Sequence, residues 1–250
     1  MAWTVVVVAV AALGAGCGPA TDQSPGVSSG TPSYGTSLDA AVPPDVLDAP
    51  LVDDRGRAVS LRSWRGKTIV LSDVMTLCQE TCPLVTASML ASARQIDATP
   101  RGRDVEFVSL TIDPRRDDLR HLRAYHRQFG SIPNWAVLTG TPTVVDRLWS
   151  RLGIWRRTTR LHAPYPTDWL TGRPLTTDIA HTDELIFITG QRFRYEMEGP
   201  GNVPARRIPH RIYRFMDALG HRNARTPDAG AWTPDQVTSV LDRVLGKESS

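Results

Sequence analysis

Apolar and polar residues alternate along residues 45–250 with two different periods, and these predict strands and helices in turn. Two β-branched apolar runs, TIVLSDVM at residues 68–75 and VEFVSLTI at residues 105–112, predict buried strands. The predicted strands are 51–52, 59–64 (a short strand or a turn), 68–75, 105–112, 135–138, 184–189 and 193–197. The last two flank Gly190-Gln191 and are expected to form a hairpin.

Four helices are predicted between and after these strands, at residues 83–96, 117–129, 142–152 and from Thr233 to Leu245. The last one opens with Thr233-Pro-Asp-Gln236, a capping-box pattern. The order is strand, helix, strand, helix, strand, helix, hairpin and helix. It predicts an α/β fold in which a central mixed sheet carries helices on both faces.

The N-terminal residues indicate export. Residues 1–16 are mostly apolar but shorter than the roughly 18–20 residues of a membrane-spanning helix, so they predict a signal peptide. The ending Leu13-Gly-Ala-Gly-Cys17 resembles a bacterial lipobox, in which Cys17 would be lipidated; an ordinary secretion signal and a short uncleaved anchor are the alternatives. Residues 17–44, rich in Ser, Gly, Pro and Thr, predict a flexible tether. We therefore expect the domain in the periplasm, or anchored by its N-terminus to the outer face of the bacterial cytoplasmic membrane.

Charge and motifs exclude several kinds of function. The formal net charge is only +3, and Lys and Arg are interspersed with Asp and Glu. The sequence has no basic run with interleaved aromatic residues, so we expect no nucleic-acid partner. It also has no Gly-rich phosphate loop, nucleophile elbow or His-Glu-x-x-His motif.

Cys78 and Cys82 are the residues best suited to chemistry, because the third cysteine, Cys17, lies in the export segment. Side chains four residues apart on one helical turn have Cβ atoms about 5–6 Å apart. One soft cation could then bind both sulfurs at about 2.3 Å. A disulfide requires Cβ atoms about 3.5–4.5 Å apart, so the turn would have to loosen. The pair lies where the first long strand meets the first long helix, which is the thioredoxin arrangement, and a helix start favours a thiolate.

Four segments together resemble the Sco (SenC) family of copper-delivery proteins, which have a thioredoxin-like fold. They are Cys78-Gln-Glu-Thr-Cys82-Pro83 with Thr76 before it, Val108-Ser-Leu-Thr-Ile-Asp113-Pro-Arg-Arg-Asp117, Trp135-Ala-Val-Leu-Thr-Gly140 and Ala180-His181-Thr182. Ala180 stands where the family usually has Asp. The resemblance implies a thioredoxin-like copper-binding domain over residues 45–250, with insertions near 156–180 and 199–230.

The resemblance implies a copper metallochaperone with Cys78, Cys82 and His181 as metal ligands. Two thiolates and one imidazole suit Cu(I) in a roughly trigonal site, and Cu(II) when a further ligand joins. The copper would be delivered to the copper centre of a respiratory cytochrome oxidase. The expected partners are a copper-receiving oxidase subunit or another copper chaperone, and the protein would be a carrier rather than an enzyme.

Two other functions would use the same thiols. A thiol–disulfide oxidoreductase of the thioredoxin type would use Cys78 and Cys82 as a redox pair on exported cysteines of an oxidase subunit. It would not need His181, but the usual spacing in such enzymes is Cys-x-x-Cys. A peroxide-handling thioredoxin-like enzyme is the third interpretation.

We do not expect the other histidines or the aromatic residues to be metal ligands. His121 and His126 are five residues apart, so they do not share a helix face, and we expect both on the surface. Trp155, Tyr165 and Trp169 either form a docking surface or take part in ordinary packing.

Overall fold

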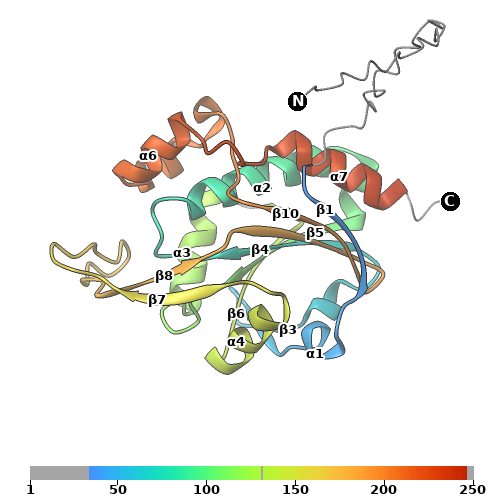
Figure 1. The fold of residues 1–250 in the computed structure, drawn as a ribbon, viewed down its shortest axis with the longest axis horizontal. Helices are drawn as coiled ribbons and strands as arrows, with labels where there is room; N and C mark the ends of the chain where they lie inside the picture. Colours follow the sequence, from blue (N-terminus) through green and yellow to red (C-terminus); the bar gives the residue numbers. More distant parts are fainter. Residues whose placement is uncertain (1–33, 131, 247–250) are drawn as a thin grey trace, which may run out of the picture. The chain divides into compact units, whose positions relative to one another are not determined.

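The computed structural model describes residues 34–130 and 132–246 of the 250-residue chain. Its centre is an eight-stranded sheet with the order β1-β10-β9-β4-β5-β6-β2-β3 (Figure 1). The strands of this sheet are β1 Thr36–Ala41, β2 Leu51–Asp53, β3 Ala58–Val59, β4 Thr68–Val74, β5 Val105–Thr111, β6 Trp135–Gly140, β9 Glu184–Thr189 and β10 Arg192–Glu198. Strands β4, β5 and β6 are parallel, and the other pairings are antiparallel, so the predicted mixed sheet is confirmed.

A second, two-stranded antiparallel sheet is formed by β7 Arg156–Arg160 and β8 Thr177–His181 (yellow to orange in Figure 1). The helices are α1 Pro44–Leu47, α2 Cys82–Asp97, α3 Leu119–Phe129, α4 Pro142–Arg151, α5 His210–Phe215, α6 Ala218–Arg225 and α7 Pro234–Gly246. Short 3-10 turns cover Leu61–Trp64, Pro100–Asp104 and Ala205–Arg207.

Helices cover both faces of the large sheet, and the alternation of side chains along β4 shows why. Val70 and Val74 pack into the core cluster that contains α2, α3 and α7, whereas Ile69 and Leu71 pack into the cluster that contains α1 and α4. A strand that is buried on both faces has a mostly apolar sequence, and this one is apolar except at Thr68, Ser72 and Asp73. Figure 1 shows α2 and α7 on one side of the sheet and α1 and α4 on the other.

Local signals in the sequence correctly predict two further features. The β9–β10 hairpin turns at Gly190 and Gln191, whose φ angles of 57° and 64° are those of a tight hairpin turn. At the start of α7, the Thr233 amide donates to the Gln236 side chain at 2.7 Å. The Gln236 amide donates to the Thr233 hydroxyl at 3.4 Å, which completes the capping box.

The expected boundary of the tether at residue 44 is too late. Strand β1 pairs with β10, and α1 follows it, so the sheet already includes residues from Thr36 onward. β1 is an exposed edge strand held by main-chain hydrogen bonds, and its side chains, except that of Leu38, are small or polar and give no apolar pattern. The expected signal peptide and Cys17 lie outside the described residues. None of the helices in the described part of the chain is long and apolar enough to span a membrane.

Candidate metal centre

The two cysteines lie at the junction of β4 and α2, as the sequence predicts, but not on one helical turn. Helix α2 begins at Cys82, and Cys78 lies in the turn before it, where its amide donates to the Met75 carbonyl at 3.1 Å. Cys82 is 3% exposed and Cys78 is half-buried, and both are free thiols. The turn therefore brings the sulfur of Cys78 back to the N-terminus of α2.

The sulfur of Cys78 is surrounded by hydrogen-bond donors. A hydrogen bond from the Cys82 thiol lowers the pKa of Cys78, against the effect of burial, and the backbone N–H groups of Cys82, Glu80 and Thr81 lower it further. The same thiol contact, together with burial, raises the pKa of Cys82 well above its usual value. These opposite pKa shifts favour a thiolate at Cys78 and a protonated thiol at Cys82.

His181 lies at the end of β8 and is held by carboxylates. Its Nδ1 atom lies 3.2 Å from Oδ2 of Asp73, near the end of β4, and 3.0 Å from the Thr182 carbonyl oxygen. Burial would lower the pKa of His181, but Asp73, Asp183 and the Thr182 carbonyl outweigh it and raise this pKa to about 9. Within the described residues, no hydrogen bond or ion pair engages Nε2, so a metal can bind this nitrogen once the ring has given up its second proton.

The imidazole and the sulfurs are gathered at the same end of the sheet without forming a closed triad. Within residues 34–130 and 132–246, the cluster of ligand atoms that lie within 4.8 Å of one another is formed by Asp73, His181 and Asp183. The sulfurs lie outside this cluster. The negative charges of Asp183 and Asp73 nevertheless contribute to the raised pKa of Cys82, so they lie within electrostatic range of the thiol. Burial and the charge of Asp73 also raise the pKa of Asp183 to about 7.

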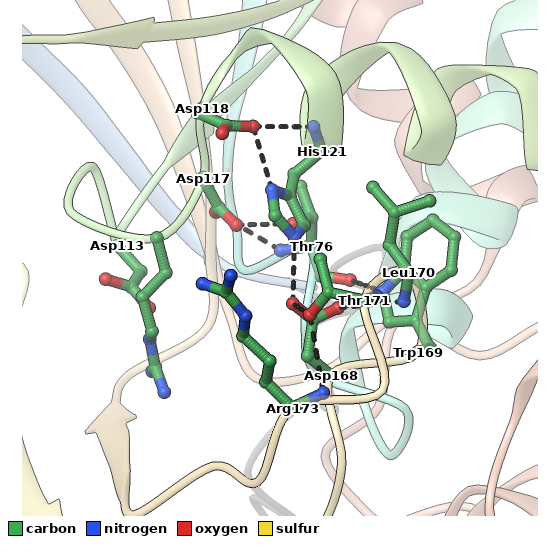
Figure 2. A network of polar contacts seen from close by, with 11 residues as sticks. Thr76, Asp113, Asp117, Asp118, His121, Asp168, Trp169, Leu170, Thr171 and Arg173 are labelled. Carbon is green, nitrogen blue, oxygen red and sulfur yellow. Dashed lines mark hydrogen bonds and ion pairs between the residues drawn. The ribbon is translucent and has the colours of Figure 1, made fainter.

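Polar groups fix the start of the cysteine turn (Figure 2). The buried carboxylate of Asp117 accepts hydrogen bonds from the Thr76 hydroxyl, from the Thr76 amide at 3.2 Å and from the Thr111 hydroxyl at 2.5 Å. The Trp169 indole donates to the Thr76 carbonyl at 2.7 Å. Thr76, two residues before Cys78, is therefore held through its amide, its carbonyl and its side chain.

The C-terminal insertion holds the other part of the turn. The Gln79 side chain donates to the Phe215 carbonyl at 2.6 Å, and the Asp217 amide donates to the Gln79 carbonyl at 3.0 Å. Trp169 packs edge-on against Phe215 with ring centroids 5.1 Å apart. Segments 156–180 and 199–230, which the resemblance implies are insertions, thus meet around the cysteine turn and support it together.

His121 is not the surface residue that its spacing suggested. It is 7% exposed, and its ring bridges two carboxylates, with Nδ1 2.8 Å from Asp118 and Nε2 3.2 Å from Asp168 (Figure 2). Asp168 also accepts from the amides of Leu170 and Thr171. This bridge ties the loop between β7 and β8 to α3. An Asp-rich helix start facing a histidine was the available signal, but the contact with Asp168 spans 47 residues of sequence.

The aromatic residues of the first insertion divide between packing and exposure. Trp169 packs, as described above, whereas Trp155 and Tyr165 are 52% and 44% exposed. Ordinary packing thus accounts for Trp169, whereas Trp155 and Tyr165 are exposed as a docking surface requires.

Comparison with known proteins finds a family profile and individual relatives that match this chain. The SCO1/SenC family profile matches residues 48–215. The mitochondrial SCO2 homolog of Homo sapiens is 33% identical over 94 residues, which are 38% of this chain and 35% of that protein. The SCO1 homolog of Bacillus subtilis is 31% identical over 86 residues, which are 34% of this chain and 44% of that protein. The matched stretch thus spans less than half the length of either relative.

A solved structure shows the same fold. The crystal structure of Arabidopsis thaliana ScoI with copper bound superposes with a TM-score of 0.53 at 17% identity, covering 86% of this chain and 99% of that one. At this level of identity the likeness concerns the fold, and it confirms the predicted thioredoxin-like architecture.

Proposed function

Because the chain belongs to the SCO1/SenC family, we propose that it is a copper metallochaperone that carries copper between Cys78, Cys82 and His181. The observation that carries this proposal is the gathering of these residues at one end of the sheet. A donor-stabilised sulfur faces a second thiol there, and an imidazole is held through Nδ1 so that Nε2 is left for a ligand. The related ScoI of Arabidopsis thaliana was crystallised with copper bound.

The donor set suits the cargo. Two sulfurs and one imidazole nitrogen are soft or borderline ligands of the kind that Cu(I) selects. Within the described residues the imidazole lies with Asp73 and Asp183 rather than within 4.8 Å of both sulfurs, so loading requires the ring and the sulfurs to approach one another. Asp73 and the Thr182 carbonyl hold the Nδ1 side of the ring, so Nε2 is the nitrogen that loses its proton and binds copper in that step.

Cu(I) competition tests the ligand set. The reduced domain is titrated with Cu(I) against a chromophoric chelator, alongside Cys78→Ser, Cys82→Ser and His181→Ala. We expect each cysteine variant to lose at least about a hundredfold in affinity, and His181→Ala at least about tenfold, because each change removes a direct ligand. His162→Ala, a change at an exposed loop histidine, is the matched control and should bind like the wild type. Wild-type affinity in His181→Ala would contradict the three-ligand site.

We also propose the place and the recipient. The apolar segment at residues 1–16 and Cys17 support export and attachment to the outer face of the cytoplasmic membrane. The recipient would be an oxidase subunit or another copper chaperone. Cell fractionation of the full chain, with Cys17→Ser as the variant, tests the attachment: release of only the variant into the soluble fraction would support lipidation.

A thiol–disulfide oxidoreductase is the second candidate, and the opposite pKa shifts of the two thiols favour it. A nucleophilic thiolate beside a protonated resolving thiol is the arrangement that such enzymes use. Reduction of an exported disulfide substrate that is lost in Cys78→Ser but kept in His181→Ala would support this function. If Cys78→Ser keeps both copper binding and the reducing activity, both candidate functions are wrong.

A further inference from the structure

A cleft of about 380 Å³ lies between the β7–β8 hairpin and the loop that joins β5 to α3. Arg115, Arg116, Arg156 and Arg157 line it together with only two acidic residues, Asp113 and Asp146. The lining is thus strongly basic in a chain whose formal net charge is only +3.

Both acidic residues are already neutralised by arginines of the same cleft. Arg116 forms an ion pair with Asp113, and its guanidinium also donates to the Thr177 carbonyl at 2.6 Å. Arg156 pairs with Asp146 at 2.7 Å. Arg115 and Arg157 are exposed and make no ion pair within the described residues, so two guanidinium groups are available to an anionic partner.

The rest of the cleft is suited to a protein rather than to a small anion. Ile112, Pro114 and Ile179 give it apolar walls, and the guanidinium of Arg157 lies 5.7 Å from the centre of the exposed Trp155 ring. Arginine and tryptophan beside apolar surface are the residue types enriched at the centres of protein interfaces.

The cleft lies on the hairpin that carries His181. Arg156 is the cross-strand partner of His181, and Thr158 is the partner of Ile179. Directly paired residues of an antiparallel sheet project from the same face. The Thr182 amide also donates to the Trp155 carbonyl at 3.1 Å. Arg156 and His181 therefore share one face of the hairpin, whereas Arg157, the partner of Ala180, projects from the other. A chain bound in the cleft would lie along the hairpin whose strand β8 ends in His181.

We propose that this cleft binds an acidic segment of the protein that exchanges copper with this domain. The proposal rests on the copper-carrier function proposed above and adds the surface on which the partner docks. Carboxylates of the partner pair with Arg115 and Arg157, apolar side chains of the segment cover the isoleucines and Trp155, and the partner's metal ligands are brought beside His181.

Fluorescence anisotropy with a fluorescein-labelled hexaglutamate peptide tests the proposal at low ionic strength, with hexaglutamine as the uncharged probe. We expect hexaglutamate to bind and hexaglutamine not to bind. Arg115→Gln/Arg157→Gln should weaken hexaglutamate binding about five- to tenfold, because two exposed ion pairs are lost. The matched control is Arg206→Gln/Arg207→Gln, which removes the same charge from exposed residues of the C-terminal insertion and should change the affinity less than about twofold.

Three results would overturn the proposal: no hexaglutamate binding by the wild type, equal weakening in both double variants, or complete displacement by an equal concentration of inorganic phosphate. The first two indicate no more than net-charge attraction, and the third indicates a general anion site. Cu(I) affinity measured on the same variants should be unchanged. The two proposals can fail separately. If the wild type does not bind Cu(I), the carrier function is wrong, and the hexaglutamate result then tests only whether the cleft binds an acidic peptide.

Discussion

At the scale of single residues, buried carboxylates organise the candidate metal centre. Asp73, whose side chain is 1% exposed, faces Nδ1 of His181 through Oδ2 and accepts from the Glu184 amide through Oδ1 at 3.1 Å. A carboxylate on one ring nitrogen fixes the tautomer and leaves the other nitrogen for a metal. Ala180 precedes the histidine here, and Asp73 supplies a carboxylate from a different strand.

Asp73→Asn should weaken Cu(I) binding by about ten- to a hundredfold. The amide oxygen can still accept from Glu184, but the negative charge beside Nδ1 is lost. Only the Thr182 carbonyl then accepts from Nδ1, so the ring is held less firmly in the orientation that leaves Nε2 for copper. Chelator competition measures the loss. In a His181→Ala background the same change should have no further effect, because its action passes through the ring. An equal loss in both backgrounds would show a structural effect instead.

Asp117 predicts a pH effect on stability. Burial and the charge of Asp113 raise the pKa of Asp117 from 3.8 to about 7, although the hydroxyls of Thr111 and Thr76 and the Thr76 amide oppose this. The folded protein therefore holds a proton that the unfolded chain has lost between these two pH values. The contribution of Asp117 to the free energy of unfolding must then fall as the pH rises through that range.

Asp117→Asn removes this titration. Relative to the wild type, the variant should gain stability between about pH 5 and about pH 8, because only the wild type must ionise a buried carboxyl. Urea unfolding at both values measures the difference, in which all other titrating groups cancel. A difference that is independent of pH would show that Asp117 is ionised throughout.

At the scale of elements, helix α6 closes on the cysteine turn where only a glycine fits. A Cβ atom added at Gly220 would lie 2.6 Å from the Gln79 carbonyl oxygen and 2.9 Å from that of Glu80. Distances this short force the backbone apart. The cysteine turn and α6 therefore depend on each other for their positions.

Gly220→Ala should lower the free energy of unfolding by about 1–3 kcal/mol and also weaken Cu(I) binding, because the clash pushes on the turn that carries Cys78. Gly246→Ala is the matched control at the end of helix α7, where an added Cβ meets nothing within 4 Å. Its stability should change by less than about 0.5 kcal/mol. Thermal unfolding and chelator competition on both variants give the result; a Gly220→Ala protein as stable as the control would contradict the contact.

At the scale of the whole molecule, the sequence predicts the parts of the fold that have a strong period. Strands β4 and β5 were predictable because both of their faces are buried and must be apolar. Helices α3 and α7 were predictable because each has one apolar face. Strands β1 and β7 were not, because TSLDAA and RRTTR are exposed and are held by main-chain pairing. The short, Arg-rich α5 and α6 likewise have too few apolar residues to give a clear stripe.

The candidate site was predictable only as far as its motif extends. Cys78, Cys82 and His181 stand in recognisable segments, whereas their supports come from distant positions: Asp117 lies 41 residues from Thr76, and Trp169 lies 93. One signal was available, since the aspartate within the apolar run TIVLSDVM must be buried. A buried charge in a strand requires a partner, and His181 is that partner.

The unequal exposure of the two sulfurs determines which of them reacts or binds first. Cys82 is 3% exposed beneath the start of α2, whereas Cys78 is half-buried and carries the donors that favour a thiolate. An incoming electrophile, thiol or metal complex must therefore meet Cys78 first, and Cys82 can only complete what its neighbour begins. Brief treatment with iodoacetamide followed by peptide mass spectrometry should find the label at Cys78 well before Cys82. Any transfer to or from the two sulfurs would then begin at Cys78.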